Sequence, residues 1–297
     1  MKTISFIYAL FFSMYTEYAI TYSAQNEYES LVKGAFWQFS IVPEENGTQE
    51  LLEWKITSNL PCTQNESVNG LGFRTVHAQT KEKFTQANFK ASFLVLKKSS
   101  NPFDFFPNPN PKMDYDAVES LTFKTEHETY LRKTRYTHLP NDFNTIFSFD
   151  RKKSSFENLL DLNHWVFVHL FFKVGVTQVD TPLREIIEKR HGVCQDFTHL
   201  FLAIARENHI AVRYVSGYLH QGNGYFGDSQ MHAWAEAYVP RAGWIGFDPT
   251  NDILVADNHI KVCHGLDYSD CSPLKGVIYS EGGNTTSHSI EVKASQQ

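Results

Sequence analysis

The stretch RHGVCQDFTHLF, residues 190–201, combines a glycine, a cysteine and the apolar spacing of a helix. Apolar residues recur on one helical face between positions 197 and 204, which predicts a helix from about Cys194 to Asn208. Cys194 then stands at the helix N-terminus, where the first amide N–H groups have no partner within the helix and the dipole favours negative charge. That position suits a reactive thiolate, whereas the ordinary role of a lone helix cysteine is that of a small buried side chain.

A predicted hairpin downstream of this helix supplies the partners of the cysteine. Residues 231–239 and 243–250 show strand patterns, and the turn PRAG joins them. In an antiparallel hairpin, the start of the first strand lies beside the end of the second. His232 is therefore expected to lie next to Asp248, and both are expected to meet Cys194.

A cysteine, a histidine and an aspartate in this arrangement predict a thiol nucleophile with its general base. The thiolate is the attacking species, and both a helix N-terminus and an imidazolium stabilise its charge. His232 can act as base and then as acid, while Asp248 orients its ring. The backbone N–H of Cys194 or of Gln195 is expected to donate a hydrogen bond to an oxyanion.

Other residues of these strands are weaker candidates. Trp234 alternates with alanines, so core packing is expected, with a role as a wall of the cleft as the alternative. Asn251 follows Asp248 in the chain and is a candidate for substrate binding. A further group could suggest zinc, but its spacing is irregular and contains no C-x-x-C pair, so no metal and no cofactor are predicted. This group consists of His259, Cys263, His264 and Cys271.

The composition limits the class of protein. The chain has 297 residues, 42% of them hydrophobic, which is enough apolar material for a substantial core. The net charge of -6 and the lack of a long basic run exclude nucleic acid as a partner. Four cysteines are too few for a disulfide scaffold in a chain of this length, although Cys263 and Cys271 could pair. No calcium loop of the EF-hand type is present. The sequence does not indicate an oligomeric state.

Four segments are expected along the chain. The first is an N-terminal extension of residues 1–17. Residues 18–100 alternate short aromatic and β-branched runs with turns, which predicts an antiparallel β-sandwich. Residues 101–150 form a linker and connecting segment that begins with four prolines within twelve residues. Residues 151–297 form the catalytic domain, where helices precede an antiparallel sheet. The overall expectation is an α+β fold.

The helix before Cys194 has recognisable ends. Thr181 is a suitable N-cap residue, followed by Pro182 at the first helical position, and Gly192 is expected to end this helix. A preceding apolar run from Phe156 to Phe172 predicts a buried helix. A strand at residues 211–219 precedes the hairpin.

The N-terminus leaves several interpretations open. One lysine and a mostly apolar run from Ile4 to Tyr15 resemble a weak export signal. A true start at Met14, or packing of this segment as an extra strand, is the simpler interpretation. The run is too short to span a bilayer, so no membrane span is predicted. We expect a cytoplasmic protein, with export as the alternative.

The motifs together resemble a known family. GVCQDF at residues 192–197, HAWAE at 232–236 and GWIGFDPTN at 243–251 closely resemble the bacterial transglutaminase-like family, whose members are described as candidate cysteine proteases. DYSD at 267–270 and PLKG at 273–276 resemble the trailing motifs of this family. The resemblance covers about residues 18 to 292, including the β-rich first half.

The resemblance implies a papain-like transglutaminase core with the order Cys194, His232 and Asp248. Gln195 stands where animal transglutaminases have a tryptophan, a departure that puts protein cross-linking in question. We therefore expect a cysteine peptidase or amidase that acts on peptides or proteins through a thioester. The alternatives are an acyl transferase that joins amines to glutamine or peptide acyl groups, and a non-enzymatic protein-binding module.

Overall fold

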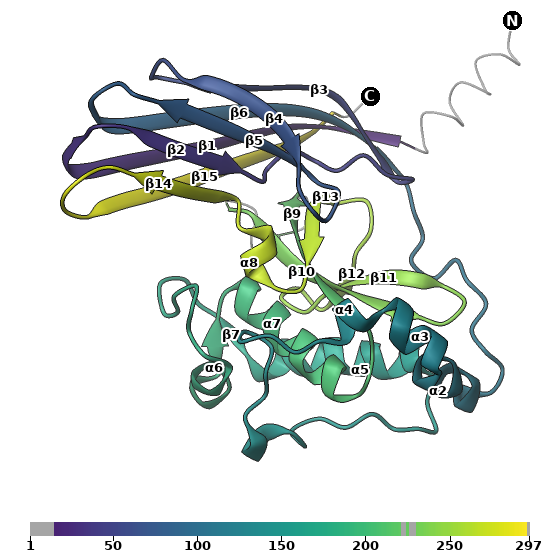
Figure 1. Ribbon diagram of the computed structural model, residues 1–297. Coiled ribbons are helices and arrows are strands. Elements are labelled where there is room, and N and C mark those ends of the chain that lie inside the picture. Colours follow the sequence, from purple (N-terminus) through teal and green to yellow (C-terminus); the bar gives the residue numbers. More distant parts are fainter. Residues whose placement is uncertain (1–14, 221–223, 226–229, 296–297) are drawn as a thin grey trace, which may run out of the picture.

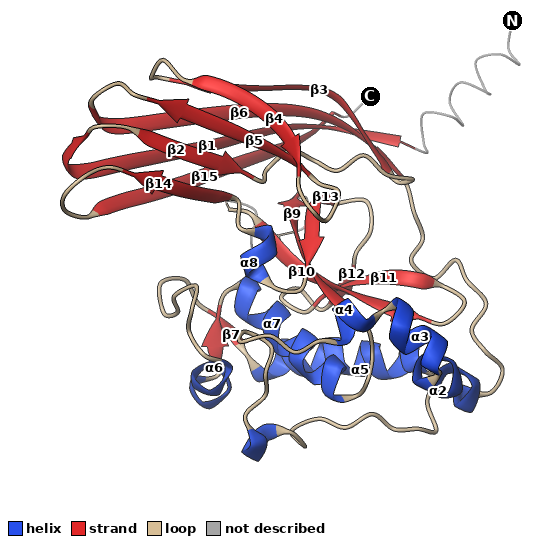
Figure 2. Ribbon diagram, viewed as in Figure 1, coloured by secondary structure: helices blue, strands red, loops and turns tan. Residues whose placement is uncertain are grey.

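The computed structural model of the protein describes residues 15–220, 224–225 and 230–295. It has the predicted α+β fold, with an antiparallel β-sandwich stacked on a papain-like core of helices and antiparallel sheet (Figure 1). The sheet of the core lies between the sandwich and the helices, as the colouring by secondary structure shows (Figure 2). This layering gives the core sheet one face toward the helices and another toward the sandwich.

The sandwich consists of two four-stranded antiparallel sheets. The first, in the order β15-β1-β6-β3, contains β1 (Tyr15–Val32), β3 (Gln49–Ser58), β6 (Phe84–Lys98) and β15 (Asn284–Ser295). The second, in the order β14-β2-β5-β4, contains β2 (Ala35–Phe39), β4 (Thr63–Val68), β5 (Arg74–Thr80) and β14 (Leu274–Ile278). Aromatic rings join the two sheets, since Trp37 and Phe39 pack edge-on against Phe89 at centroid distances of 4.9 and 4.8 Å.

The last two strands of the chain return to the sandwich. β15 pairs along β1, and β14 pairs with β2, so residues 274–295 lie in the sandwich sheets and not in the core expected for residues 151–297. Only Ile290 of β15 is buried, so this strand has no apolar face that a sequence pattern could reveal. β1 begins at Tyr15, inside the expected extension, and the export question falls on residues 1–14, outside the described residues.

The core sheet has five antiparallel strands in the order β12-β11-β10-β9-β13. Their bounds are β9 (Val212–Leu219), β10 (His232–Val239), β11 (Gly243–Asp248), β12 (Ile253–Leu254) and β13 (His259–Gly265). β7 (Phe171–Phe172) and β8 (His191–Gly192) form a separate parallel pair. The expected strands at 211–219, 231–239 and 243–250 are therefore confirmed.

Most of the helices cover the face of the core sheet that points away from the sandwich, whereas α8 lies between α7 and the sandwich (Figure 1). Their bounds are α2 (Pro111–Glu119), α3 (Leu121–Glu126), α4 (Glu128–Leu131), the 3-10 helix η1 (Asn141–Phe143), α5 (Ser155–His169), α6 (Leu183–Lys189), α7 (Cys194–Glu207) and α8 (Tyr268–Cys271). Within the part of the chain that the structure describes, no helix combines the length and apolar character needed to cross a bilayer.

The end of α6 differs from the expectation. The helix begins after Pro182 and ends at Lys189, where Arg190 adopts the left-handed conformation expected of Gly192. Gly192 serves another purpose, because a Cβ atom there would collide with the side chain of Asp196. Gly192, two residues before Cys194, therefore allows the chain to pass close to the start of α7.

Candidate active site

Asp196 fixes the start of α7. Its carboxylate accepts hydrogen bonds from the backbone N–H of Val193 at 2.8 Å and from the hydroxyl of Thr177 at 2.7 Å. The side chain is buried, and burial raises the pKa of Asp196, although both hydrogen bonds oppose this. The contact with Val193 is the reciprocal half of a capping box, so it sets Cys194 as the first helical residue.

His232 and Asp248 form a buried pair, as the hairpin register predicts. Ala235 lies opposite Phe247, so the start of β10 lies beside the end of β11. There His232 Nε2 lies 2.7 Å from Asp248 Oδ2. Neither side chain is exposed to solvent. Burial lowers the pKa of His232, but the Asp248 carboxylate and then Cys194 outweigh burial and raise it to about 10. Asp248 therefore favours the imidazolium form of the ring.

The second ring nitrogen of His232 is available to Cys194. Because Nε2 is held by Asp248, only Nδ1 can exchange a proton with a reacting group, and Nδ1 has no oxygen or nitrogen partner among the described residues. The Cys194 thiol interacts with this imidazole and contributes to the raised pKa of His232. The thiol also lies 3.9 Å from the carbonyl oxygen of Met231, the residue before the histidine.

Asp248 is held by more than His232. Its Oδ2 accepts from Asn251 Nδ2 at 2.8 Å and from His259 Nε2 at 3.2 Å, and its Oδ1 accepts from the Thr250 amide at 3.1 Å. Burial raises the pKa of Asp248, but His232 and then His259 outweigh it and hold this pKa well below the usual range. A carboxylate with four donors keeps its charge and its orientation.

A cavity of about 290 Å³ connects these residues with solvent. Cys194, Gln195 and His232 line it, and exposed Gln178 and Gln230 lie at its rim. The backbone N–H groups of Cys194 and Gln195 belong to the first turn of α7, where they have no partner within the helix. A carbonyl carbon beside Sγ would therefore have donors for its developing oxyanion.

The other candidate residues, Gln195, Asn251 and Trp234, lie in different places. Gln195 lies in the cavity, and its side-chain amide donates to the Val179 carbonyl at 3.0 Å. Asn251 is not part of the cavity lining, since it supports the Asp248 carboxylate from the side. Trp234 does not line this cavity either.

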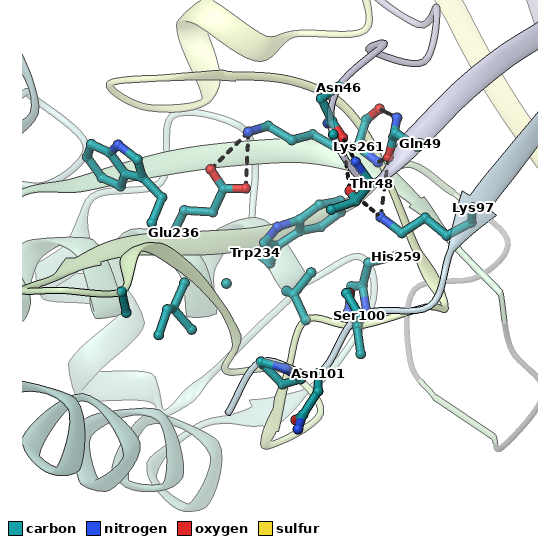
Figure 3. A pocket seen from close by; sticks show the side chains of 18 of the residues that line it. Asn46, Thr48, Gln49, Lys97, Ser100, Asn101, Trp234, Glu236, His259 and Lys261 are labelled. Carbon is teal, nitrogen blue, oxygen red and sulfur yellow. Dashed lines mark hydrogen bonds and ion pairs between the residues drawn. The ribbon is translucent and has the colours of Figure 1, made fainter. Parts of the chain in front are cut away.

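Trp234 lies on the sandwich side of the core sheet, in a second cavity that Figure 3 shows. Its ring centroid is 5.2 Å from that of His259 and 6.2 Å from that of His232. The tryptophan therefore packs behind the His232 ring and does not face the thiol.

The group considered for zinc is dispersed. His259 contacts Asp248, and His264 lies 3.1 Å from the Tyr130 hydroxyl. Cys263 and Cys271 are buried free thiols. No disulfide joins the two cysteines, although the sequence allowed one.

His232, Asp248 and His259 do bring three ligand atoms within 4.8 Å of one another. The 2.7 and 3.2 Å contacts of Oδ2 are hydrogen-bond lengths, so this arrangement fits a hydrogen-bonded chain better than zinc coordination.

Sequence reasoning missed the contact of His259 with Asp248. This histidine begins β13, which pairs with β9 and not with the hairpin strands. No spacing rule connects residue 259 with residue 248, because an irregular loop separates them. Only the strand order of the sheet could have revealed the contact.

The comparisons with known proteins agree with this fold. Residues 147–249 match the model of the transglutaminase-like superfamily. An uncharacterized protein of Mycobacterium tuberculosis is 27% identical over 282 residues, which cover 90% of this chain and 89% of the relative. An uncharacterized protein of Mycobacterium leprae is 25% identical over 279 residues, with coverage of 92% and 97%.

A solved structure shares the fold over nearly the whole chain. The crystal structure described as "a Putative Cysteine Protease from Cytophaga hutchinsonii" has a TM-score of 0.75 and 19% identity, and the match covers 95% of this chain and 92% of that one. The similarity therefore includes the sandwich as well as the core.

Proposed function

We propose that this chain is a cysteine enzyme that cleaves amide or peptide bonds, with Cys194 as nucleophile, His232 as general base and acid, and Asp248 as the group that orients the histidine. The match of residues 147–249 to the model of the transglutaminase-like superfamily supports this proposal. One observation carries the proposal. His232 is held at Nε2 by a buried carboxylate, and its imidazole interacts with the thiol of a cysteine at a helix N-terminus.

The first half-reaction forms a thioester. His232 Nδ1 holds the proton taken from the thiol, and Sγ attacks the carbonyl carbon of the substrate, whose π electrons move to oxygen. The first-turn amides of α7 stabilise that oxyanion. When the carbonyl re-forms, the C–N bond breaks and the leaving amine takes the proton from Nδ1.

The second half-reaction decides the kind of enzyme. Water that gives its proton to Nδ1 attacks the thioester, and the products are a carboxylic acid and the free thiol. We favour hydrolysis because the cavity has exposed residues at its rim and water is always available there. An amine that enters in place of water would give acyl transfer through the same groups.

A peptide library treated with the protein tests this proposal. We expect cleavage products or deamidated glutamines with the wild type and none with Cys194→Ala. The reaction is repeated with a primary amine such as putrescine, and mass spectrometry separates the acid from the amine adduct. Adducts in excess of acid would replace hydrolysis by acyl transfer. Equal products from both proteins would contradict the role of Cys194 and favour a binding module.

A further inference from the structure

The second cavity, of about 440 Å³, lies between the sandwich and the core sheet (Figure 3). This volume is within the range of small-molecule sites. Residues from five separate parts of the chain line it, including Gln49 and Lys97 of the sandwich and Trp234, His259 and Lys261 of the core sheet. The two cavities have no lining residue in common, so this one is separate from the cavity of Cys194.

Most charged groups in this cavity already have partners. The Glu236 carboxylate binds Lys261 Nζ at 2.9 and 3.0 Å and also pairs with Arg213. Burial raises the pKa of Glu236, but the two cations outweigh burial and lower it to about 2. This ion-paired cluster stays charged, and the Glu236 carboxylate is already paired with two cations.

Lys97 is the exception. Its side chain is 5% exposed, and the polar contacts of Nζ are the Thr48 hydroxyl at 3.3 Å and the Gln49 amide oxygen at 3.5 Å. Among the ion pairs of the described residues, none reaches Lys97 within 4.0 Å. Burial lowers the pKa of Lys97 to about 8, against the attraction of Asp257 and Glu236. A buried ammonium with two weak neutral acceptors lacks a counter-charge.

Two further side chains in the lining are buried polar groups without a partner. Trp234 is 1% exposed and its Nε1–H has no acceptor, and His259 is 2% exposed and its Nδ1 has no partner among the described residues. Figure 3 shows Trp234 lying between the Glu236–Lys261 ion pair and Lys97, with His259 on the side of Lys97. Each unsatisfied buried group destabilises the folded protein, and a ligand with matching groups would remove this cost.

We propose that this cavity is a binding site for a small carboxylic acid. The carboxylate supplies the counter-charge for Lys97 and an acceptor for Trp234 Nε1–H. A neutral ligand would leave the ammonium unpaired, and a cation would be repelled by Lys97. The site reaches the proposed catalytic residues through His259, whose Nε2 contacts Asp248.

Binding of simple acids to the full chain tests the proposal without any assay of activity. The probes are acetate, benzoate and succinate, each compared with its amide. The five tryptophans give separate indole N–H signals in a nitrogen-15 NMR spectrum, and Trp234→Phe assigns the signal of Trp234. At about 20 mM, at least one acid is expected to move the Trp234 signal and to raise the melting temperature, whereas its amide does neither.

Lys97→Met is the matched variant, because methionine keeps much of the side-chain volume and removes the charge. It is expected to weaken binding of the responding acid at least about tenfold. An acid bound near Cys194 and His232 instead would leave the Trp234 signal in place. The proposal is overturned if no acid moves that signal, if the amides act equally, or if folded Lys97→Met binds as tightly as the wild type.

Discussion

Two cavities of this protein meet at one carboxylate, that of Asp248. His232 binds Asp248 Oδ2 at 2.7 Å and belongs to the cavity of Cys194. His259 binds the same oxygen at 3.2 Å and belongs to the cavity of Lys97. The two histidines differ in charge, since Asp248 raises the pKa of His232 to about 10, whereas burial lowers the pKa of His259.

This difference assigns distinct tasks to similar side chains. A charged imidazolium suits proton exchange with a thiol, while a neutral imidazole donates one hydrogen bond to Asp248 and keeps a lone pair toward its own cavity. The shorter contact, at 2.7 Å, fixes the orientation of the His232 ring. The longer contact supports the carboxylate without competing for the proton.

Removal of the thiol affects the cavity of Cys194 alone and has the largest expected effect. Cys194→Ala should lower hydrolysis of a responsive peptide by about 10⁴-fold or more, because no other group forms the thioester. The melting temperature should stay close to that of the wild type, since Cys194 is only half-buried. Cys62→Ala, which removes a half-buried thiol of the sandwich, is the matched control and should retain full activity.

Removal of the Asp248 charge affects both histidines, and therefore both cavities. Asp248→Asn should reduce kcat by about 10³- to 10⁴-fold, because an amide in place of the carboxylate mis-orients His232 and no longer supports its charge. The measurement is steady-state kinetics with the same peptide. Unchanged kcat in a folded variant would remove Asp248 from the mechanism.

Removal of the contact between His259 and Asp248 sharpens the comparison. His259→Phe should lower kcat about tenfold and shift the basic limb of its pH profile, because Asp248 loses one donor while His232 keeps its hydrogen bond. His264→Phe changes a histidine of the same strand that points to Tyr130, and it should leave both quantities unchanged. Equal effects of the two substitutions would show that His259 has only a packing role.

The pH dependence of stability has the smallest expected effect. Because folding raises the pKa of His232, its charged form stabilises the fold fully below about pH 6.5, and this stabilisation is lost as the pH rises toward about 10. Because folding lowers the pKa of Asp248, its charged form stabilises the fold above about pH 3.8, and this stabilisation is lost in acid. The difference in free energy of unfolding between wild type and Asp248→Asn should therefore be largest between these limits. Urea unfolding at about pH 5, 7 and 9 measures it, and a difference that grows with pH would contradict the assignment.

The group of Cys194, His232 and Asp248 could be predicted from sequence because its parts are local. One helix start and one hairpin bring these three residues within reach, and both follow from spacing and turn length. The cavity of Lys97 could not be predicted in this way. Lys97 and His259 are 162 positions apart in the numbering of the chain, and only the packing of the sandwich on the sheet brings them together.

The fold shows the same division. The alternating strands of the first half and the helix of Cys194 are visible in the sequence. The return of β15 to the sandwich is not, because eleven of its twelve side chains lack the burial that produces an apolar pattern. The sequence also predicted the wrong end for α6, because Gly192 was interpreted as a helix cap. Glycine is required there by the close approach of the chain to Asp196.

The reactivity of Cys194 tests the central claim most directly. Iodoacetamide is applied at about pH 6, and mass spectrometry follows each of the four cysteines separately. We predict that Cys194 reacts at least about tenfold faster than N-acetylcysteine, because His232 and the helix N-terminus stabilise its thiolate, and that His232→Gln removes this advantage. Alkylation of Cys194 no faster than that of the free thiol would contradict the account.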